Sequence, residues 1–356
     1  MTTSTVPSAA LQHSDPRWKR LPVVAQVRRA VGLQRGMLVA GLVICGVFLL
    51  TAAFAPLVAP YGFGQLGDDA GSFPRQAAPS AEHLWGTTVG GYDVFSRVVW
   101  GSRTALAVIV VAVVLSITIG VVLGLVSGYI GGWLDRVLVV VADAVYAFPS
   151  LLLAIVVSIV ISGGQSSLWG GIAAAGISIT VVFVPQYFRV VRAEAVRLKA
   201  EAFVESAKVN GSSTARIMFK HVLRNATRSL PLILTLNASE AILTLAALGF
   251  LGFGIGPTAA AEWGYDLNRA LADTASGIWW TGVFPGAAIV LVVLGITLVG
   301  ESLNDLADPR LRTRRRARVG GRRTRTASTE PAAAAVAGAA GTTAGGDADD
   351  HEGARA

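Results

Sequence analysis

Long stretches without charged residues dominate this sequence. Met37 to about Val58 holds roughly 22 consecutive uncharged residues. Five further apolar stretches lie near residues 102–127, 137–161, 168–188, 229–252 and 278–301. A helix needs about 20 predominantly apolar residues to cross the hydrocarbon core of a bilayer. The sequence therefore predicts an all-α, polytopic membrane protein with six transmembrane helices.

Composition supports this fold class over a soluble one. Apolar residues make up 53% of the chain and charged residues 15%, and the mean hydropathy is +0.58. Core helices of soluble proteins are usually shorter and amphipathic. The first stretch is also longer than the apolar region of about 7–15 residues in a signal peptide. We interpret it as an anchor that is retained.

Basic residues indicate the orientation, because they concentrate on the cytoplasmic side of membrane proteins. With the N-terminus inside, 26 of the 30 Lys and Arg residues fall on that side. The other four are Arg75, Arg97, Arg103 and Arg269. We therefore predict that both termini are cytoplasmic and that residues from about 60 to 100 form an external loop.

The predicted domain organisation follows from these segments. Residues 1–36 form a cytoplasmic N-terminal segment, and residues 37–310 form the transmembrane domain. Residues 311–356 are rich in Arg, Ala, Gly and Thr, and they lack the large apolar residues that offset the entropy cost of ordering, so we expect a disordered tail. The net charge is +8, but the basic residues flank the apolar segments, and this distribution disfavours nucleic acid as a partner.

Motifs for catalysis or cofactor binding are not evident. The sequence contains no G-x-x-x-x-G-K-[ST] phosphate loop, the motif that would cradle ATP. The one cysteine, Cys45, lies in the first apolar stretch, and the four histidines are scattered without metal-ligand spacing. We expect this chain to be no enzyme and to hold no cofactor or metal.

The cytoplasmic stretch of about 193–228 predicts two short helices joined at a bend. Arg197 and Glu201 are four residues apart, and Glu205 and Lys208 are three apart, which is the spacing of ion pairs on a helix. Gly211 suits a left-handed helix stop. Either Ser212 or Ser213 can then cap the next helix.

This stretch resembles a known motif. Glu205-Ser206-Ala207, three further residues and Gly211 are similar to the E-A-A-x-x-x-G loop of ABC importer permeases. The resemblance implies that the loop is a coupling helix that docks on an ATPase subunit, with Ala207 small enough to enter a groove there. The residues assigned to this loop are Glu201, Glu205, Ser206, Ala207, Gly211 and Arg216.

The resemblance extends from about His83 to Arg312 and is closest to the C-type permease of dipeptide and oligopeptide importers. The matching stretches begin at His83 (HLWGT), Asp93 (DVFSR), Gly128 (GYIGGW), Ala147 (AFPSLL), Leu251 (LGFG) and Leu306 (LADPRLR). The chain departs from the usual family residues at Tyr92, Arg224 and Leu245.

Family resemblance implies the partners and the compartment. A second permease subunit would complete the pathway in the bacterial plasma membrane. ATPase subunits would bind ATP and Mg, and an extracytoplasmic binding protein would deliver a short peptide. Nickel or another small solute is the alternative cargo within the family. An ion-coupled secondary transporter is the alternative from another class. Such transporters use paired intramembrane charges and internal repeats, but this sequence has few such charges and no clear repeat.

Two acidic residues lie inside predicted spans, Asp143 in the third and Glu240 in the fifth. A carboxylate that faces lipid costs several kcal/mol, so both should face the bundle interior, a partner or water. They are candidates for the translocation path, where Glu240 would meet the amino group of a peptide. The alternative is a structural role, either an interhelical hydrogen bond or packing near the membrane edge. Asp143 lies close to the predicted cytoplasmic end, where simple hydration is a further alternative.

Overall fold

Five helices of the computed structural model are long and apolar enough to cross a membrane, and they correspond to five of the six spans that the sequence predicted. The structure describes residues 33–162, 167–227 and 229–307, all of which belong to one unit, Met1–Ala307. The second unit, Asp308–Ala356, and therefore the predicted tail, lies outside the described residues. The five helices are α2 (Leu33–Ala53), α4 (Val94–Ile130), α7 (Leu168–Lys199), α11 (Leu230–Phe250) and α13 (Trp280–Ala307).

The predicted third span has a different form from the one we expected. Instead of one helix over residues 137–161, the chain forms α5 (Gly132–Ala147) and α6 (Ser150–Ser162), which meet at an angle of 99°. Phe148 is extended, with φ −89° and ψ 141°, because the residue before a proline avoids the helical region. Pro149 therefore breaks the span, and the bent pair counts as a sixth span only when it is taken together.

Glycines on α4 allow the close packing of α4 against α7. Gly120, Gly124 and Gly128 recur every four residues, so they lie on one face of α4. A Cβ atom added at each would lie only 2.5 to 2.6 Å from an atom of α7. Small residues at this spacing let the backbones of spanning helices approach closely. The central contact of the fold thus depends on three residues without side chains.

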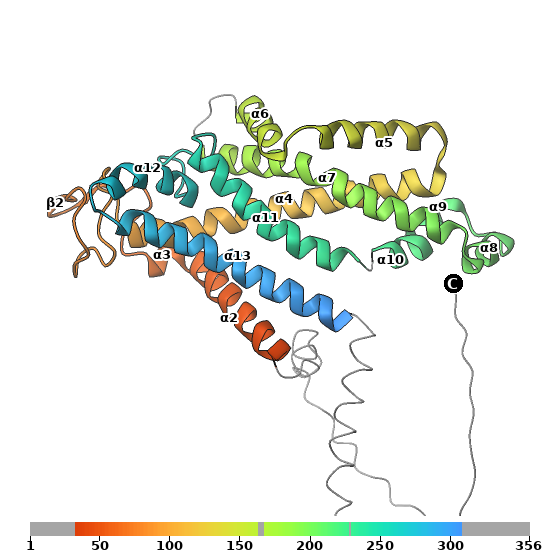
Figure 1. Cartoon of the computed structure of the whole chain (residues 1–356), viewed down its shortest axis with the longest axis horizontal. Coiled ribbons are helices and arrows are strands. Elements are labelled where there is room, and N and C mark those ends of the chain that lie inside the picture. Colours follow the sequence, from red (N-terminus) through yellow and green to blue (C-terminus); the bar gives the residue numbers. More distant parts are fainter. Residues whose placement is uncertain (1–32, 163–166, 228, 308–356) are drawn as a thin grey trace, which may run out of the picture. The chain divides into compact units, whose positions relative to one another are not determined.

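Shorter elements gather at the two ends of α4. At its N-terminal end lie α3 (Ala55–Val58), the antiparallel pair β1 (Gly67–Asp68) and β2 (Gly71–Ser72), and α12 (Trp263–Ala275). At its C-terminal end lie α8 (Ala202–Val209), α9 (Thr214–Arg216), the π-helical η2 (Ile217–Val222) and α10 (Leu223–Ala226) (Figure 1). The helix α12 was not predicted, because its 13 residues are too polar and too few to span a membrane.

Candidate functional site

Residues 201–226, here called the coupling segment, contain the predicted glycine bend. Gly211 has φ +72°, and its N–H donates to the carbonyl of Lys208 at 2.9 Å. The next N–H, of Ser212, donates to the carbonyl of Ala207 at 3.0 Å. This pair of bonds is the Schellman motif, in which a left-handed residue ends a helix. Within the described part of the chain, no atom lies within 4 Å of an added Cβ, so it is the backbone conformation that favours glycine here.

The second helix of the segment starts at a side-chain cap. Ser213, rather than Ser212, accepts a hydrogen bond from the backbone N–H of Arg216 at 3.4 Å. The helical path then continues from α9 through η2 and α10 to Ala226. A π-helical turn inside a helix is uncommon and frequently lies at a functional site. The predicted pair of helices is confirmed, with a π-helical turn that the sequence did not indicate.

Buried apolar side chains attach the coupling segment to the bundle. Val204, Ile217 and Val222 are at most 1% exposed and belong to the main hydrophobic core. Ala207 is half-buried and packs against the same core. It lies three residues after Val204, on the same helical face. Part of the Ala207 surface thus contacts its own chain and part stays exposed, and its contact with a groove of another protein stays a prediction.

The opposite face of α8 is open. Glu205 and Ser206 are exposed on it, and Val209 is 88% exposed. Lys208 is also exposed, at the edge of the face that carries Val204. Glu205 and Lys208 form no ion pair with each other or with another described residue. Arg216 is exposed at the end of α9. This face of α8 is therefore accessible to another protein.

A hollow of about 430 Å³ lies at the base of α8, between α7 and the end of the coupling segment. Arg197 lines the hollow and forms two ion pairs there, to Glu194 at 2.9 Å and to Glu201 at 3.3 Å. The second pair was predicted from the spacing. The exposed fractions of the Arg197 and Glu201 side chains are 60% and 46%. Ion pairs this exposed contribute little to stability, so they leave the segment adaptable.

The two acidic residues of the spans lie in one exposed region but do not contact each other. Asp143 on α5 pairs with Arg189 on α7 at 2.6 Å, and the Arg189 guanidinium lies 4.2 Å from the ring centre of Tyr146. Glu240 on α11 is exposed, and its charge acts on the Tyr146 hydroxyl. Sequence reasoning missed Arg189 and Tyr146, because no local spacing links α5 to α7.

Comparison with known proteins identifies the family of this chain. A family model described as "Binding-protein-dependent transport system inner membrane component" matches residues 120–313. The matched range includes the coupling segment, Asp143 and Glu240. The chain belongs to this family. It is therefore a multi-pass membrane permease of a transport system rather than an enzyme.

Relatives in the family carry peptide-related names. A dipeptide transport system permease protein from Alkalihalophilus pseudofirmus is 38% identical over 279 residues, which is 77% of this chain and 86% of the relative. A glutathione transport system permease protein from Shigella flexneri is 38% identical over 266 residues, or 75% and 84%. A putative peptide transport system permease protein from Brucella suis is 34% identical over 299 residues, or 84% and 96%.

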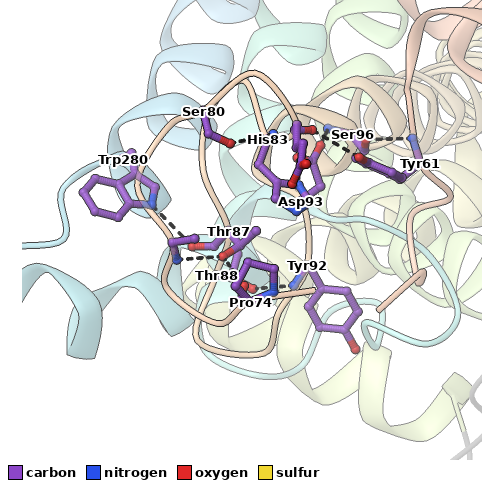
Figure 2. Close-up of polar contacts among 12 residues, drawn as sticks. Tyr61, Pro74, Ser80, His83, Thr87, Thr88, Tyr92, Asp93, Ser96 and Trp280 are labelled. Carbon is purple, nitrogen blue, oxygen red and sulfur yellow. Dashed lines mark hydrogen bonds and ion pairs between the residues drawn. The ribbon is translucent and has the colours of Figure 1, made fainter. Parts of the chain in front are cut away.

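At the other end of the permease, residues 60–93 and α12 form a second structured region, here called the cap. His83 Nδ1 lies 3.0 Å from Asp93 Oδ1, and Asp93 Oδ2 accepts from the backbone N–H of Ser96 at 2.8 Å, capping α4 (Figure 2). The Trp280 indole donates to the carbonyl of Thr87 at 3.3 Å. Two of the sequence stretches that carried the family resemblance, beginning at His83 and Asp93, thus meet in space.

A buried ion pair joins α4 to α12 within the cap. Arg97 Nε donates to Asp266 Oδ1 at 2.6 Å, and these side chains are 2% and 7% exposed. Burial raises the pKa of Asp266, and the Arg97 charge opposes that rise. The Arg97 guanidinium also lies 4.8 Å from the ring centre of Tyr92, one of the residues that departs from the family pattern. The ring thereby supplies a cation–π contact.

Glu262 fastens the start of α12 to the end of α11. Its carboxylate accepts hydrogen bonds from the backbone N–H groups of Gly264 and Tyr265, both at 2.8 Å. Burial raises the pKa of Glu262 to about 8, against the effect of these two bonds. The carboxylate lies directly over Gly249, where any Cβ would overlap it. Sequence reasoning missed this residue, because a single Glu beside an apolar stretch reads as a solvated loop residue.

Proposed function

We propose that this permease forms half of the pathway of an ATP-driven importer for short peptides, and that the coupling segment carries motion from an ATPase subunit into the spanning helices. The observation that carries the proposal is the two-sided character of α8. Val204 and Ala207 hold one face against the core, whereas Glu205 and Val209 are exposed on the other. A force applied to the exposed face would therefore reach α4 and α7 through packed side chains.

The proposed orientation places the coupling segment in the cytoplasm and the cap outside. The support is the distribution of basic residues, 26 of 30 of which fall on the side of the coupling segment. ATP and Mg would be bound by ATPase subunits, since the sequence contains no phosphate loop of its own. A second permease would complete the pathway, and a binding protein would deliver cargo to the cap.

A short peptide is the proposed cargo. The relatives are named for dipeptides, glutathione and peptides, and nothing in those names favours nickel. Peptides carry an ammonium and a carboxylate, and the exposed Glu240 carboxylate offers a partner for the ammonium. Closure of the ATPase subunits on ATP would move the spanning helices as rigid bodies. This movement would switch access to the pathway from one side of the membrane to the other.

One experiment tests this function in the reconstituted importer, with all its subunits, in lipid vesicles. ATP-dependent uptake of a labelled dipeptide and retention of the ATPase subunits are measured together. Gly211→Val should reduce both at least tenfold, because a branched residue at φ +72° is strained by about 1–2 kcal/mol or more. Gly211→Asn is the matched control, since Asn tolerates the left-handed conformation. It should retain most of the uptake.

A third variant separates cargo binding from coupling. Glu240→Gln should lower uptake of a dipeptide with a free amino group and leave ATPase retention unchanged. Uptake near the wild-type level in Gly211→Val would contradict the coupling role. Equal uptake by Glu240→Gln and the wild type would contradict the path role of Glu240, while leaving the coupling role in place.

A further inference from the structure

A second hollow, of about 160 Å³, lies where α4 and α7 begin. Its walls come from one face of α4, the first two turns of α7, Phe63 of the cap, and Ala260 and Ala261 before α12, and the lining is largely apolar. The residues used in the argument are Trp100, Arg103, Thr104 and Ala107 on α4 and Leu168 and Trp169 on α7. The α4 residues follow the spacing of neighbours on one helical face. Apolar cavities of about this size exclude water and admit hydrocarbon.

Two polar side chains border this hollow without a hydrogen-bond or ion-pair partner among the described residues. The exposed Arg103 guanidinium lies 5.9 Å from the ring centre of Trp100, and it pairs with no carboxylate among the described residues. Thr104 is only 4% exposed, yet its hydroxyl has no hydrogen bond to any part of the chain that the structure describes. The Thr104 hydroxyl is therefore a free donor on the wall of the hollow, where a ligand acceptor can reach it.

The hollow lies at the level of a membrane interface. Trp169 is 75% exposed and Leu168 is 37% exposed at the start of a spanning helix, where tryptophan is enriched in membrane proteins. Arg103 lies about 14 Å along α4 from Val94, at a rise of 1.5 Å per residue. Because Phe63 of the cap also lines it, the hollow lies at the border between the cap and the spanning helices. Lipid headgroups and the upper parts of acyl chains lie at this level.

We propose that this hollow binds a glycerophospholipid of the leaflet in which α4 and α7 begin. The lipid phosphate pairs with Arg103, an ester carbonyl accepts from the Thr104 hydroxyl, and one acyl chain enters the hollow past Ala107. Arginine suits phosphate because its guanidinium presents several donors in a planar array. The three chemical parts of the lipid thus match the cation, the unpaired donor and the apolar wall in order. This inference does not depend on the cargo.

The test uses the assembled importer and dioleoyl-phosphatidylglycerol as the probe. The complex is delipidated in detergent, incubated with the probe and analysed by native mass spectrometry. Arg103→Gln should reduce the tightest bound lipid at least threefold, and Ala107→Trp should do the same by filling the hollow. Arg269→Gln is the matched control. Arg269 lies over the ring of Tyr265 at 5.5 Å but does not line the hollow, so its variant should retain the lipid as the wild type does.

Each outcome bears on the proposal. Loss of the lipid in Arg103→Gln with retention in Arg269→Gln would support it, and inorganic phosphate at 10 mM, roughly a hundredfold above the probe, should not displace the lipid. Displacement by phosphate would show a simple anion site and overturn it. Equal retention by the wild type and Arg103→Gln would overturn it too. Crosslinking of a benzophenone at position 169 to the binding protein or the second permease, instead of to lipid, would assign the surface to that protein.

Discussion

The cap and the coupling segment place their polar interactions in opposite environments. In the cap, Arg97 and Asp266 form an ion pair in which the side chains are 2% and 7% exposed. At the coupling segment, Arg197 of α7 and Glu201 form one in which the side chains are 60% and 46% exposed. Buried pairs are costly to disturb, and exposed pairs contribute little. The cap is thus built to keep one arrangement, and the coupling segment to change its contacts.

This contrast assigns different tasks to the two ends of α4. Its first turn is capped by Asp93 and clamped to α12 through Arg97, so the cap end is held on several sides. Its last turn leads to Gly131 and Gly132, both with positive φ, and then into the lightly packed α5. Motion that enters at the coupling segment would therefore move the helix ends that are distant from the cap, while the cap stays fixed.

The largest predicted effect comes from breaking the buried pair. Arg97→Met should lower the free energy of unfolding by about 3–5 kcal/mol, because Asp266 is left buried without its cation. Thermal unfolding of the purified complex in nanodiscs measures this. The double variant Arg97→Met/Asp266→Leu should recover most of the loss, since neither charge remains buried.

Arg197→Met provides the matched comparison at the other end. It removes two ion pairs of an exposed arginine, and it should cost less than about 1 kcal/mol. A loss as large as that of Arg97→Met would contradict the proposed difference between the cap and the coupling segment.

The next effect is a pH dependence that arises in the cap. The pKa of Glu262 is raised from 4.5 to about 8, so the folded state holds this proton more tightly than the unfolded state does. The stabilising effect of the neutral carboxyl is complete below about pH 4.5 and is lost as pH rises through 8. The unfolding free energy should therefore fall by about 2 kcal/mol between pH 6 and 8.

Glu262→Gln should flatten this fall, because glutamine has a similar shape and stays neutral. Unfolding curves at several pH values measure it, and Glu82→Gln, which alters an exposed carboxylate of the cap, should keep the wild-type slope. An unchanged slope in Glu262→Gln would show that other groups, such as Asp266, cause the dependence.

Local sequence patterns predicted the local features of this permease well. The five uninterrupted spans follow from charge-free length, the bend at Gly211 from its freedom at positive φ, and the Arg197–Glu201 pair from a four-residue spacing. Each of these features depends on residues that lie close together in the sequence, within about the length of one transmembrane helix.

Features that join distant segments were not predictable in this way. Arg97 and Asp266 are 169 residues apart, and no spacing rule relates them. The angle of 99° between α5 and α6 needs more than Pro149, because Pro185 lies inside α7 without breaking it. The packing of Ala207 on its own core was not predictable either, because it depends on Val204, three residues earlier on the same face, which is buried among distant side chains.

The smallest effect on stability is expected from single cysteines at exposed positions, and it tests the comparison most directly. In a Cys45→Ser background, Glu82→Cys in the cap and Val209→Cys in the coupling segment should each change stability by less than about 0.5 kcal/mol, since both side chains are exposed. An impermeant thiol reagent on intact cells should label position 82 and not position 209. After permeabilisation, position 209 should react rapidly when the ATPase subunits are absent and slowly when they are bound, because the ATPase covers the exposed face of α8.

Labelling of position 209 in intact cells would reverse the proposed orientation. Equal reaction rates with and without the ATPase would show that the exposed face of α8 is not where the ATPase docks, even if the bend at Gly211 proves necessary for transport.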